Sequence, residues 1–277
     1  MIAAALLHTG ASLSPTAFTV HPSTAIGIVG LTCLYEWRMR RRTPRRTDTK
    51  SRVAFYVALG VMFFSLNGWL HDLSDSYLFS AHMVQHLMLA LVVAPLMIMG
   101  TPGDVLRPLL SVPGVGALAR WVTAPTRCFA IFNVVVAVWH LPPLYNYALA
   151  HHPVHIVQHL MFLAASVLMW WPVLSPLPEL PRLSYPGQML YLFLMSIPMA
   201  IISVYISYAD TVLYPMYASA PRVWGISPMN DQMIGGLIMW IPGGLFFYTI
   251  ISIVFFRWQQ RDGAESRAAA QVDWRTV

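Results

Sequence analysis

The sequence predicts an all-α fold, a polytopic membrane protein built as a bundle of seven transmembrane helices. Of the 277 residues, 57% are hydrophobic and only 10% are charged, whereas soluble domains carry about 25% charged residues. Apolar runs of membrane-spanning length recur along the whole chain. A helix of about 20 residues crosses a bilayer core of about 30 Å with its backbone hydrogen bonds satisfied internally. We therefore place the chain in a membrane.

The apolar runs define one transmembrane domain over residues 1–256. The expected spans cover residues 21–37, 52–70, 80–99, 127–147, 153–174, 187–209 and 231–256. Residues 1–10 are too short to cross and lack the basic start of a cleaved signal peptide, so we interpret them as an outer tail. Residues 257–277 are expected to form a polar cytoplasmic tail. Pro142, Pro143, Pro198 and Pro242 are expected to kink or end helices.

The basic residues predict the direction of each span. Short loops rich in Lys and Arg stay on the cytoplasmic side of a membrane. The loop after the first span reads RMRRRTPRRTDTKSR. With this loop inside, alternation places every basic residue except Arg222 on the cytoplasmic side, so the N-terminus is expected outside and the C-terminus inside. The net charge of +6 then serves topology and contact with lipid headgroups, and no nucleic-acid partner is expected.

Two segments, SAHMVQHLM and HPVHIVQHLM, repeat a pair of histidines four residues apart. Residues at this spacing share one face of a helix, and a glutamine lies beside each pair. The residues are His82, Gln85 and His86 in the third span, and His155, Gln158 and His159 in the fifth. Both spans run inward, so both pairs are expected near the outer surface, at a depth similar to that of His140 in the fourth span. Imidazole is a ligand for copper, zinc, iron and nickel.

A single membrane histidine more often snorkels to the interface or bonds a neighbouring helix than binds a metal. The repeated histidine pairs make a shared site the better interpretation. Ionisable groups are costly to place in a membrane, so several of them at one depth call for a functional explanation. We therefore predict one outward-facing metal site. Its ligands are His82, His86, His140, His155 and His159, and possible supporting residues are Gln85, Gln158, Asp231, Gln232, Trp139, Met83, Met233 and His71.

Several of the supporting residues also have a plain structural interpretation. Asp231 stands at the start of the seventh span, where it could cap that helix. Methionines mostly fill gaps between helices, with Met83 and Met233 as the candidate thioether ligands. Asp72 and Asp75, beside His71, are expected in a solvated outer loop.

Enzymatic chemistry is not expected. A zinc peptidase helix needs a glutamate directly after its first histidine, and here Met83 and Ile156 stand in that place. The sequence also lacks a phosphate-binding glycine loop of the nucleotide-binding kinds. Its two cysteines are far apart in the expected topology and form no metal-binding pair.

The segments SAHMVQHLM, APLMIMGTPG, VWHLPPLYNYAL, HIVQHLMFLAASVLMWWPVL and SPMNDQMIGGLIMWIPGG resemble the signature segments of the caa3-type cytochrome c oxidase assembly factor (CtaG) family. The resemblance implies a multi-pass protein of the bacterial cytoplasmic (inner) membrane. In that membrane, the orientation expected from the basic residues places the histidines on the periplasmic side. The resemblance also implies haem-copper oxidase subunits as partners and copper as the metal handled. The segment NGWLHDLSD, with His71, matches poorly.

Two other functions stay open from the residues alone. Histidines on facing helices could instead hold a b-type haem, as in a quinone-linked membrane redox protein. Alternatively, the histidines could be hydrogen-bonding groups within a structural scaffold that docks oxidase subunits. Copper is preferred because it heads the affinity order of divalent ions.

Overall fold

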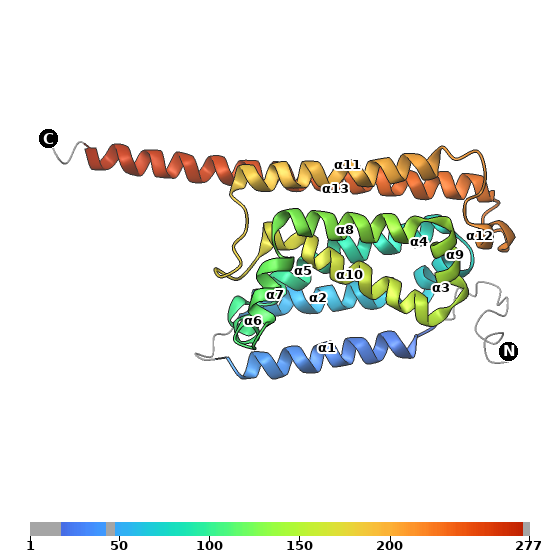
Figure 1. Cartoon of the computed structure of the whole chain (residues 1–277), viewed down its shortest axis with the longest axis horizontal. Helices are drawn as coiled ribbons and strands as arrows, with labels where there is room; N and C mark the ends of the chain where they lie inside the picture. The colour runs from blue at the N-terminus through green and yellow to red at the C-terminus, as the bar shows by residue number, and fades with distance from the viewer. Residues whose placement is uncertain (1–17, 43–47, 274–277) are drawn as a thin grey trace.

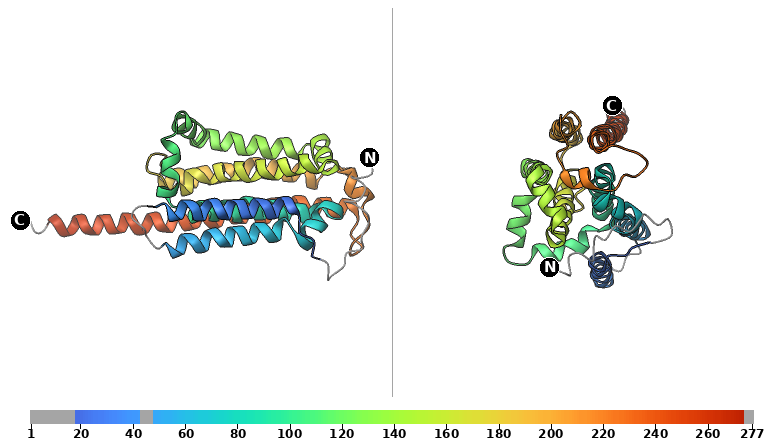
Figure 2. Two further views of the ribbon diagram at one scale, coloured as in Figure 1. Left: turned by 90° about the horizontal axis from the view of Figure 1, so that it is seen from below. Right: turned by 90° about the vertical axis from the view of Figure 1, so that its right-hand side faces the viewer.

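The computed structural model describes residues 18–42 and 48–273, with side chains described as far as residue 264. The predicted outer tail and residues 274–277 lie outside this part of the chain. Long helices run side by side, with α11 and α13 together on one side of the bundle and α1 on the opposite side (Figures 1 and 2).

The helices follow one another in chain order with short connections. They are α1 (Pro22–Arg40), α2 (Thr49–Ser65), α3 (Gly68–Ser76), α4 (Phe79–Leu87), the π-helical segment η1 (Met88–Val93), α5 (Ala94–Gly100), α6 (Gly103–Leu110), α7 (Val115–Val122), α8 (Pro125–His140), α9 (Pro142–Ala150), α10 (His152–Leu174), α11 (Tyr185–Ser207), α12 (Pro215–Ser219) and α13 (Pro228–Asp273). The all-α class is therefore confirmed for the described residues.

Four helical segments are long and apolar enough to cross a membrane. They are Phe79–Gly100, His152–Leu174, Tyr185–Ser207 and Pro228–Ala264. Two bent pairs, α2 with α3 and α7 with α8, raise the number to six if each pair is one span. The first expected span, α1, is not among them, because Glu36, Arg38 and Arg40 lower the mean hydropathy of its last turns. Within the described residues the structure supports four to six spans, and the seventh stays a prediction.

Two expected spans are broken. Residues 52–70 do not form one helix, because α2 ends at Ser65 and α3 starts at Gly68 after a bend of 45°. Gly68 has φ +63°, a conformation that glycine adopts without strain. Residues 127–147 also divide, because α8 ends at His140 and Pro142 opens α9. The residue before a proline is driven out of the helical region, and Leu141 is extended, with φ −64° and ψ 126°.

The third span, Phe79–Gly100, is continuous but contains the π-helical segment η1. Pro95 follows this segment, and a proline removes one backbone donor and crowds the carbonyl four residues earlier. A wider turn accommodates such a residue. Within η1 the carbonyl of Ala90 accepts a hydrogen bond from Nε1 of Trp170 at 2.8 Å. This bond joins the third span to α10, which carries the second histidine pair.

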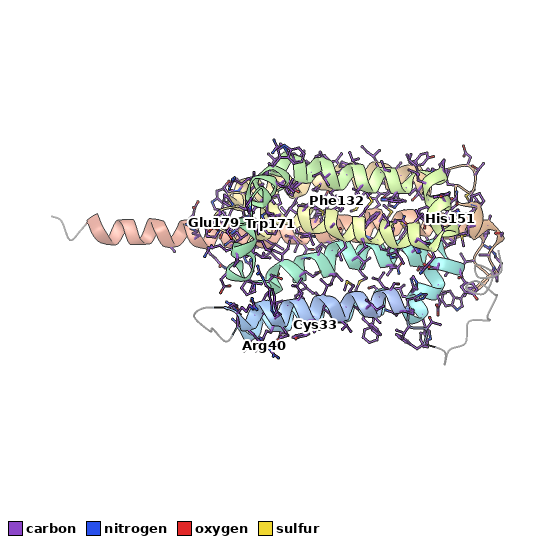
Figure 3. The ribbon with its side chains drawn as sticks, turned by 60° about the horizontal axis from the view of Figure 1, so that its bottom comes forward. Cys33, Arg40, Phe132, His151, Trp171 and Glu179 are labelled. Atoms are coloured by element: carbon purple, nitrogen blue, oxygen red, sulfur yellow. The ribbon has the colours of Figure 1, made fainter. Side chains whose placement is uncertain are left out.

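The bundle has two chemically different ends. At the end where α1 and α8 meet their arginine-bearing loops, here called the basic end, Arg42 pairs with Asp104 at 2.6 Å and Arg107 with Glu179 at 2.6 Å. The opposite end, where α4 and α10 begin, is here called the histidine end. Arg40 and Glu179 lie toward the first end, and His151 lies at the other (Figure 3). This separation supports the expected orientation, which itself stays a prediction.

Helix α13 reaches beyond the bundle. It extends for 46 residues, so the seventh helix does not end near Phe256 but continues through most of the expected polar tail. At the histidine end it packs closely on α11. A Cβ at Gly236 would lie 2.9 Å from the carbonyl oxygen of Ser203, so glycine permits the close approach of the two backbones.

Gly236→Ala is expected to lower the free energy of unfolding by about 1–3 kcal/mol, because the methyl group forces α11 and α13 apart. Thermal unfolding in detergent measures this change. Gly244→Ala, on the same helix, is the matched control, since the nearest atom to its Cβ is in Tyr248 at 3.9 Å. Equal melting temperatures for the two variants would contradict the close packing.

Candidate metal centre

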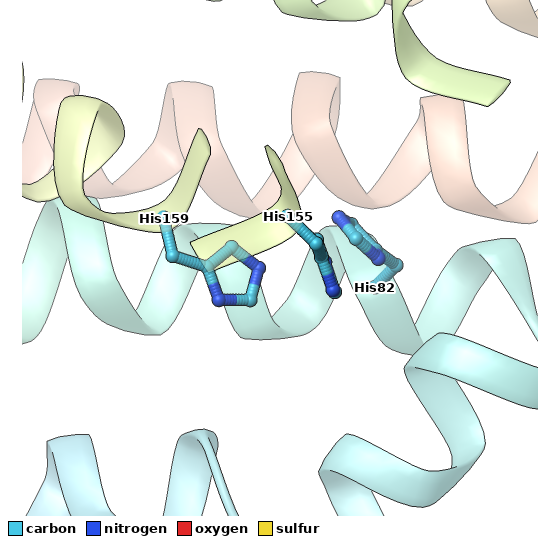
Figure 4. A group of neighbouring side chains, drawn as sticks. All are labelled: His82, His155 and His159. Carbon is cyan, nitrogen blue, oxygen red and sulfur yellow. The ribbon is translucent and has the colours of Figure 1, made fainter. Parts of the chain in front are cut away.

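Three histidines from two helices converge at the histidine end. His82 comes from α4, and His155 and His159 come from α10. One ring nitrogen of each lies within 4.8 Å of the other two, and all three side chains are buried (Figure 4). The i,i+4 spacing puts His155 and His159 on one face, and that face is turned toward α4. Ring nitrogens within 4.8 Å of one another can bind the same ion. We call this group the three-histidine site.

His86 and His140 adjoin this site without completing it. Nε2 of His86 lies 2.9 Å from Nε2 of His82. The ring centroids of His86 and His159 are 5.6 Å apart, and those of His86 and His140 are 6.1 Å apart. The five predicted ligands therefore form a connected series in which His82, His155 and His159 are the closest set and His140 is the far end.

Asp75 is a site residue that the sequence interpretation missed. Its Oδ2 lies 3.4 Å from Nδ1 of His155 and 3.4 Å from Nε2 of His71, and its side chain is only 14% exposed. The expectation of a solvated loop is wrong, because the bend after α2 forms helix α3 and turns this carboxylate inward. A histidine whose second nitrogen faces a carboxylate is a common arrangement around metals, since it fixes the tautomer and ring orientation. The i,i+4 spacing of His71 and Asp75 was the available signal.

Several ring nitrogens in this region are buried without a hydrogen-bond partner. They are Nε2 of His155, Nε2 of His159, Nε2 of His140 and Nδ1 of His86. A buried polar atom without a partner costs about 1–3 kcal/mol. On His155 the unpartnered Nε2 is opposite the Nδ1 that faces Asp75, which is the state a metal ligand requires. The donor set therefore fits a metal that accepts imidazole nitrogen, copper included.

Neighbouring polar groups hold these rings in place. The Tyr217 hydroxyl lies 3.4 Å from Nδ1 of His82 and donates to the carbonyl of Ser74 at 2.6 Å. Nε2 of Gln85 donates to the carbonyl of Ser65 at 2.8 Å and lies 3.1 Å from Nδ1 of His71. An amide nitrogen can only donate, so Nδ1 of His71 accepts and its Nε2 carries the proton toward Asp75. Gln85 and His71 thus support the site from its edge.

Asp231 and Gln232 have structural contacts instead of a place among the rings. The Asp231 carboxylate accepts hydrogen bonds from the backbone nitrogens of Phe79 at 2.6 Å and Ser80 at 3.1 Å. It therefore caps α4, the helix that carries His82, and not its own helix as expected. The side chain of Gln232 bonds the backbone of Leu213, Ile206 and Thr211, and so fixes the loop after α11.

Among the described residues, the remaining supporting candidates make no hydrogen bond or ring contact to the three-histidine site. Met83 is buried in the core against Gly235. Met233 is 41% exposed. Trp139 and Gln158 are buried, and Nε1 of Trp139 and Oε1 of Gln158 have no hydrogen-bond partner.

A groove of about 310 Å³ between α1, α2 and α10 leads to the site. Most of its walls are apolar, but they include five histidines: His21, His71, His152, His155 and His159. The rings of His21 and His71 are 4.2 Å apart, and those of His71 and His155 are 6.3 Å apart. Imidazoles therefore follow one another from the α1 side of the bundle to the three-histidine site.

The fold and the site define a polytopic helical membrane protein with a buried cluster of potential metal ligands. Residues 33–261 match the family described as cytochrome c oxidase caa3 assembly factor (Caa3_CtaG), and the chain belongs to this family. The resemblance expected from the sequence segments is thus confirmed.

The names of similar proteins add no function to the family match. Uncharacterized proteins of Mycobacterium bovis and Mycobacterium tuberculosis are each 26% identical to this chain over 203 residues, and one of Mycobacterium leprae is 23% identical. These matches cover 68% of this chain but 31% of each relative, so the chain spans about a third of the length of these curated relatives. No solved structure matches the chain significantly.

Proposed function

We propose that this protein is an assembly factor for a haem-copper oxidase that binds copper as cargo and delivers it to an oxidase subunit. The observation that carries the proposal is the convergence of His82, His155 and His159, with ring nitrogens within 4.8 Å of one another. Membership of the caa3 oxidase assembly factor family supports the oxidase as the partner. The protein acts as a carrier and not as an enzyme.

The donor set favours copper among the possible metals. The three-histidine site offers neutral nitrogen ligands, with the Asp75 carboxylate behind His155, and no cysteine lies among them. Imidazole suits copper, and in the affinity order of divalent ions copper stands above the other first-row metals. In this proposal the buried, unpartnered nitrogens of His155 and His159 bind the ion. The bonds to copper then offset the cost of burying these nitrogens without hydrogen bonds.

The groove beside α1 is the access route for the ion in this proposal. An ion that enters there meets His21 and His71 before it reaches His155. With the arginines at the basic end in the cytoplasm, the histidine end faces the periplasm of a bacterial inner membrane. Copper is then collected from the outer side of the membrane.

Haem is less compatible with this geometry. A haem iron offers two axial positions to protein ligands, whereas three imidazoles converge here and a fourth, that of His86, adjoins them. The simplest test is an absorption spectrum and metal analysis of the protein purified in detergent. We expect at least one copper per chain and no haem Soret band. A Soret band that shifts on reduction, or protein that retains no copper after copper loading, would overturn the proposal.

Asp75→Asn is expected to weaken copper binding about 10–100-fold without changing the number of ions bound at saturation. The amide keeps the size of the side chain but loses the charge that orients His155. Competition with a copper chelator of known affinity measures the change. Asp72→Asn is the matched control, since the Asp72 carboxylate accepts from Thr19 at 2.7 Å and 2.9 Å instead of facing the rings. Equal affinities for the two variants would exclude an orienting role for Asp75.

A further inference from the structure

A small cavity lies next to the three-histidine site, deeper in the bundle. Its volume is about 20 Å³, and its walls include His86, His140, Met199 and Met239. These four residues come from four different helices, α4, α8, α11 and α13. A space of this size holds one water molecule or one ion. All four side chains are buried.

Each of the two histidines at this cavity has one buried ring nitrogen without a hydrogen-bond partner. Nδ1 of His140 lies 2.7 Å from the carbonyl of Val136, and a carbonyl only accepts, so this nitrogen carries the proton. Nε2 of His140 is then a free lone pair, and it is buried without a partner. Nδ1 of His86 is also buried without a partner, while its Nε2 faces His82.

The two methionines add a different kind of donor. A thioether is a soft ligand, which suits Cu(I) better than the harder divalent ions. Met199 and Met239 are 5% and 4% exposed, so both side chains belong to the core and not to the surface. Two imidazoles and two thioethers around one small cavity offer four neutral ligands.

We propose that His86, His140, Met199 and Met239 form a second metal site, selective for Cu(I). The proposal rests on the proposed copper function and deepens it, because it assigns an oxidation state to the ion that is held deepest. His86 links the two sites, since its Nε2 lies 2.9 Å from Nε2 of His82. Copper that enters as Cu(I) can pass from the three-histidine site to the second site by ligand exchange, and no electron transfer is then needed.

Cu(I) titration of the detergent-purified protein under reducing conditions tests the second site, with X-ray absorption at the copper edge as the second readout. We expect the wild-type protein to bind two Cu(I) ions per chain and to show copper–sulfur scattering. The Met199→Leu/Met239→Leu variant should bind one ion and lose the sulfur scattering. Leucine and methionine have similar volumes, so the fold should be kept.

Met169→Leu is the control, because Met169 is buried in the same core and does not line the cavity. It should bind two ions like the wild type. One wild-type copper with nitrogen scattering alone would overturn the second site and leave the proposed function standing. No copper in the wild-type protein would overturn both. If the double variant does not fold, the sulfur scattering of the wild-type protein decides the question by itself.

Discussion

The variant in which His82, His155 and His159 are all alanine is expected to lose the copper of the three-histidine site and to fail to support oxidase assembly. These three rings are the proposed ligands of that site, whereas His86 and His140 line a separate cavity. The loss should be one copper per chain by mass spectrometry of the purified protein. In cells that depend on this chain, the absorption band and copper content of the oxidase should fall with it.

The control for the triple variant is His151→Ala. His151 stands at the same end of the bundle but is exposed, and its ring lies against Tyr147 at 4.1 Å instead of pointing inward. This variant should keep its copper and support assembly. A triple variant that retains wild-type copper would refute the site, and one that loses stability equally with and without copper would favour the scaffold function.

Asp231→Asn is expected to lower the free energy of unfolding by about 1–3 kcal/mol and to leave the stabilisation by copper unchanged. The carboxylate accepts from two backbone nitrogens at the start of α4, those of Phe79 and Ser80. An amide keeps one acceptor oxygen and turns an NH2 group toward the other nitrogen, which leaves a buried donor unmet. Thermal unfolding in detergent, with and without copper, measures both effects.

Asp210→Asn is the matched control, because Asp210 is exposed at the end of the neighbouring helix and should tolerate the change. The change in melting temperature on adding copper distinguishes a capping role of Asp231 from a role as a metal ligand. If Asp231 were a ligand, its replacement would abolish the stabilisation by copper. If Asp231 is a cap, the variant should melt at a lower temperature without copper, and copper should still raise that temperature as it does in the wild-type protein.

The histidine pairs could be predicted from the sequence because the helical period decides which residues share a face. The expected limits of the fifth and sixth spans, residues 153–174 and 187–209, differ from α10 and α11 by at most two residues at each end. These helices are apolar over most of their length and unbroken, and α11 continues through Pro198, which was expected to kink or end a helix. The direction of the side chains then followed from the spacing alone.

The missed residues share a different cause, since their place depends on neighbours that are remote in sequence. Asp75 is buried only because α3 bends away from α2 and faces α10. Asp231 caps a helix 152 residues earlier in the chain. Met199 and Met239 look like ordinary core residues in sequence, and only the packing of α11 and α13 brings them to one cavity. The break at His140 follows from Pro142, although the apolar run continues past it.

The cap on α4 also has a consequence for how the protein is made. Ribosomes add about 5–20 residues per second, so α4 exists for roughly 8–30 s before Asp231 is synthesised. During that interval the first turn of α4 has no carboxylate to receive its two amides, and His82 is not yet held in place. The helix that carries His82 therefore receives its cap only when the final helix is made, so the last contact that fixes the start of α4 forms near the end of synthesis.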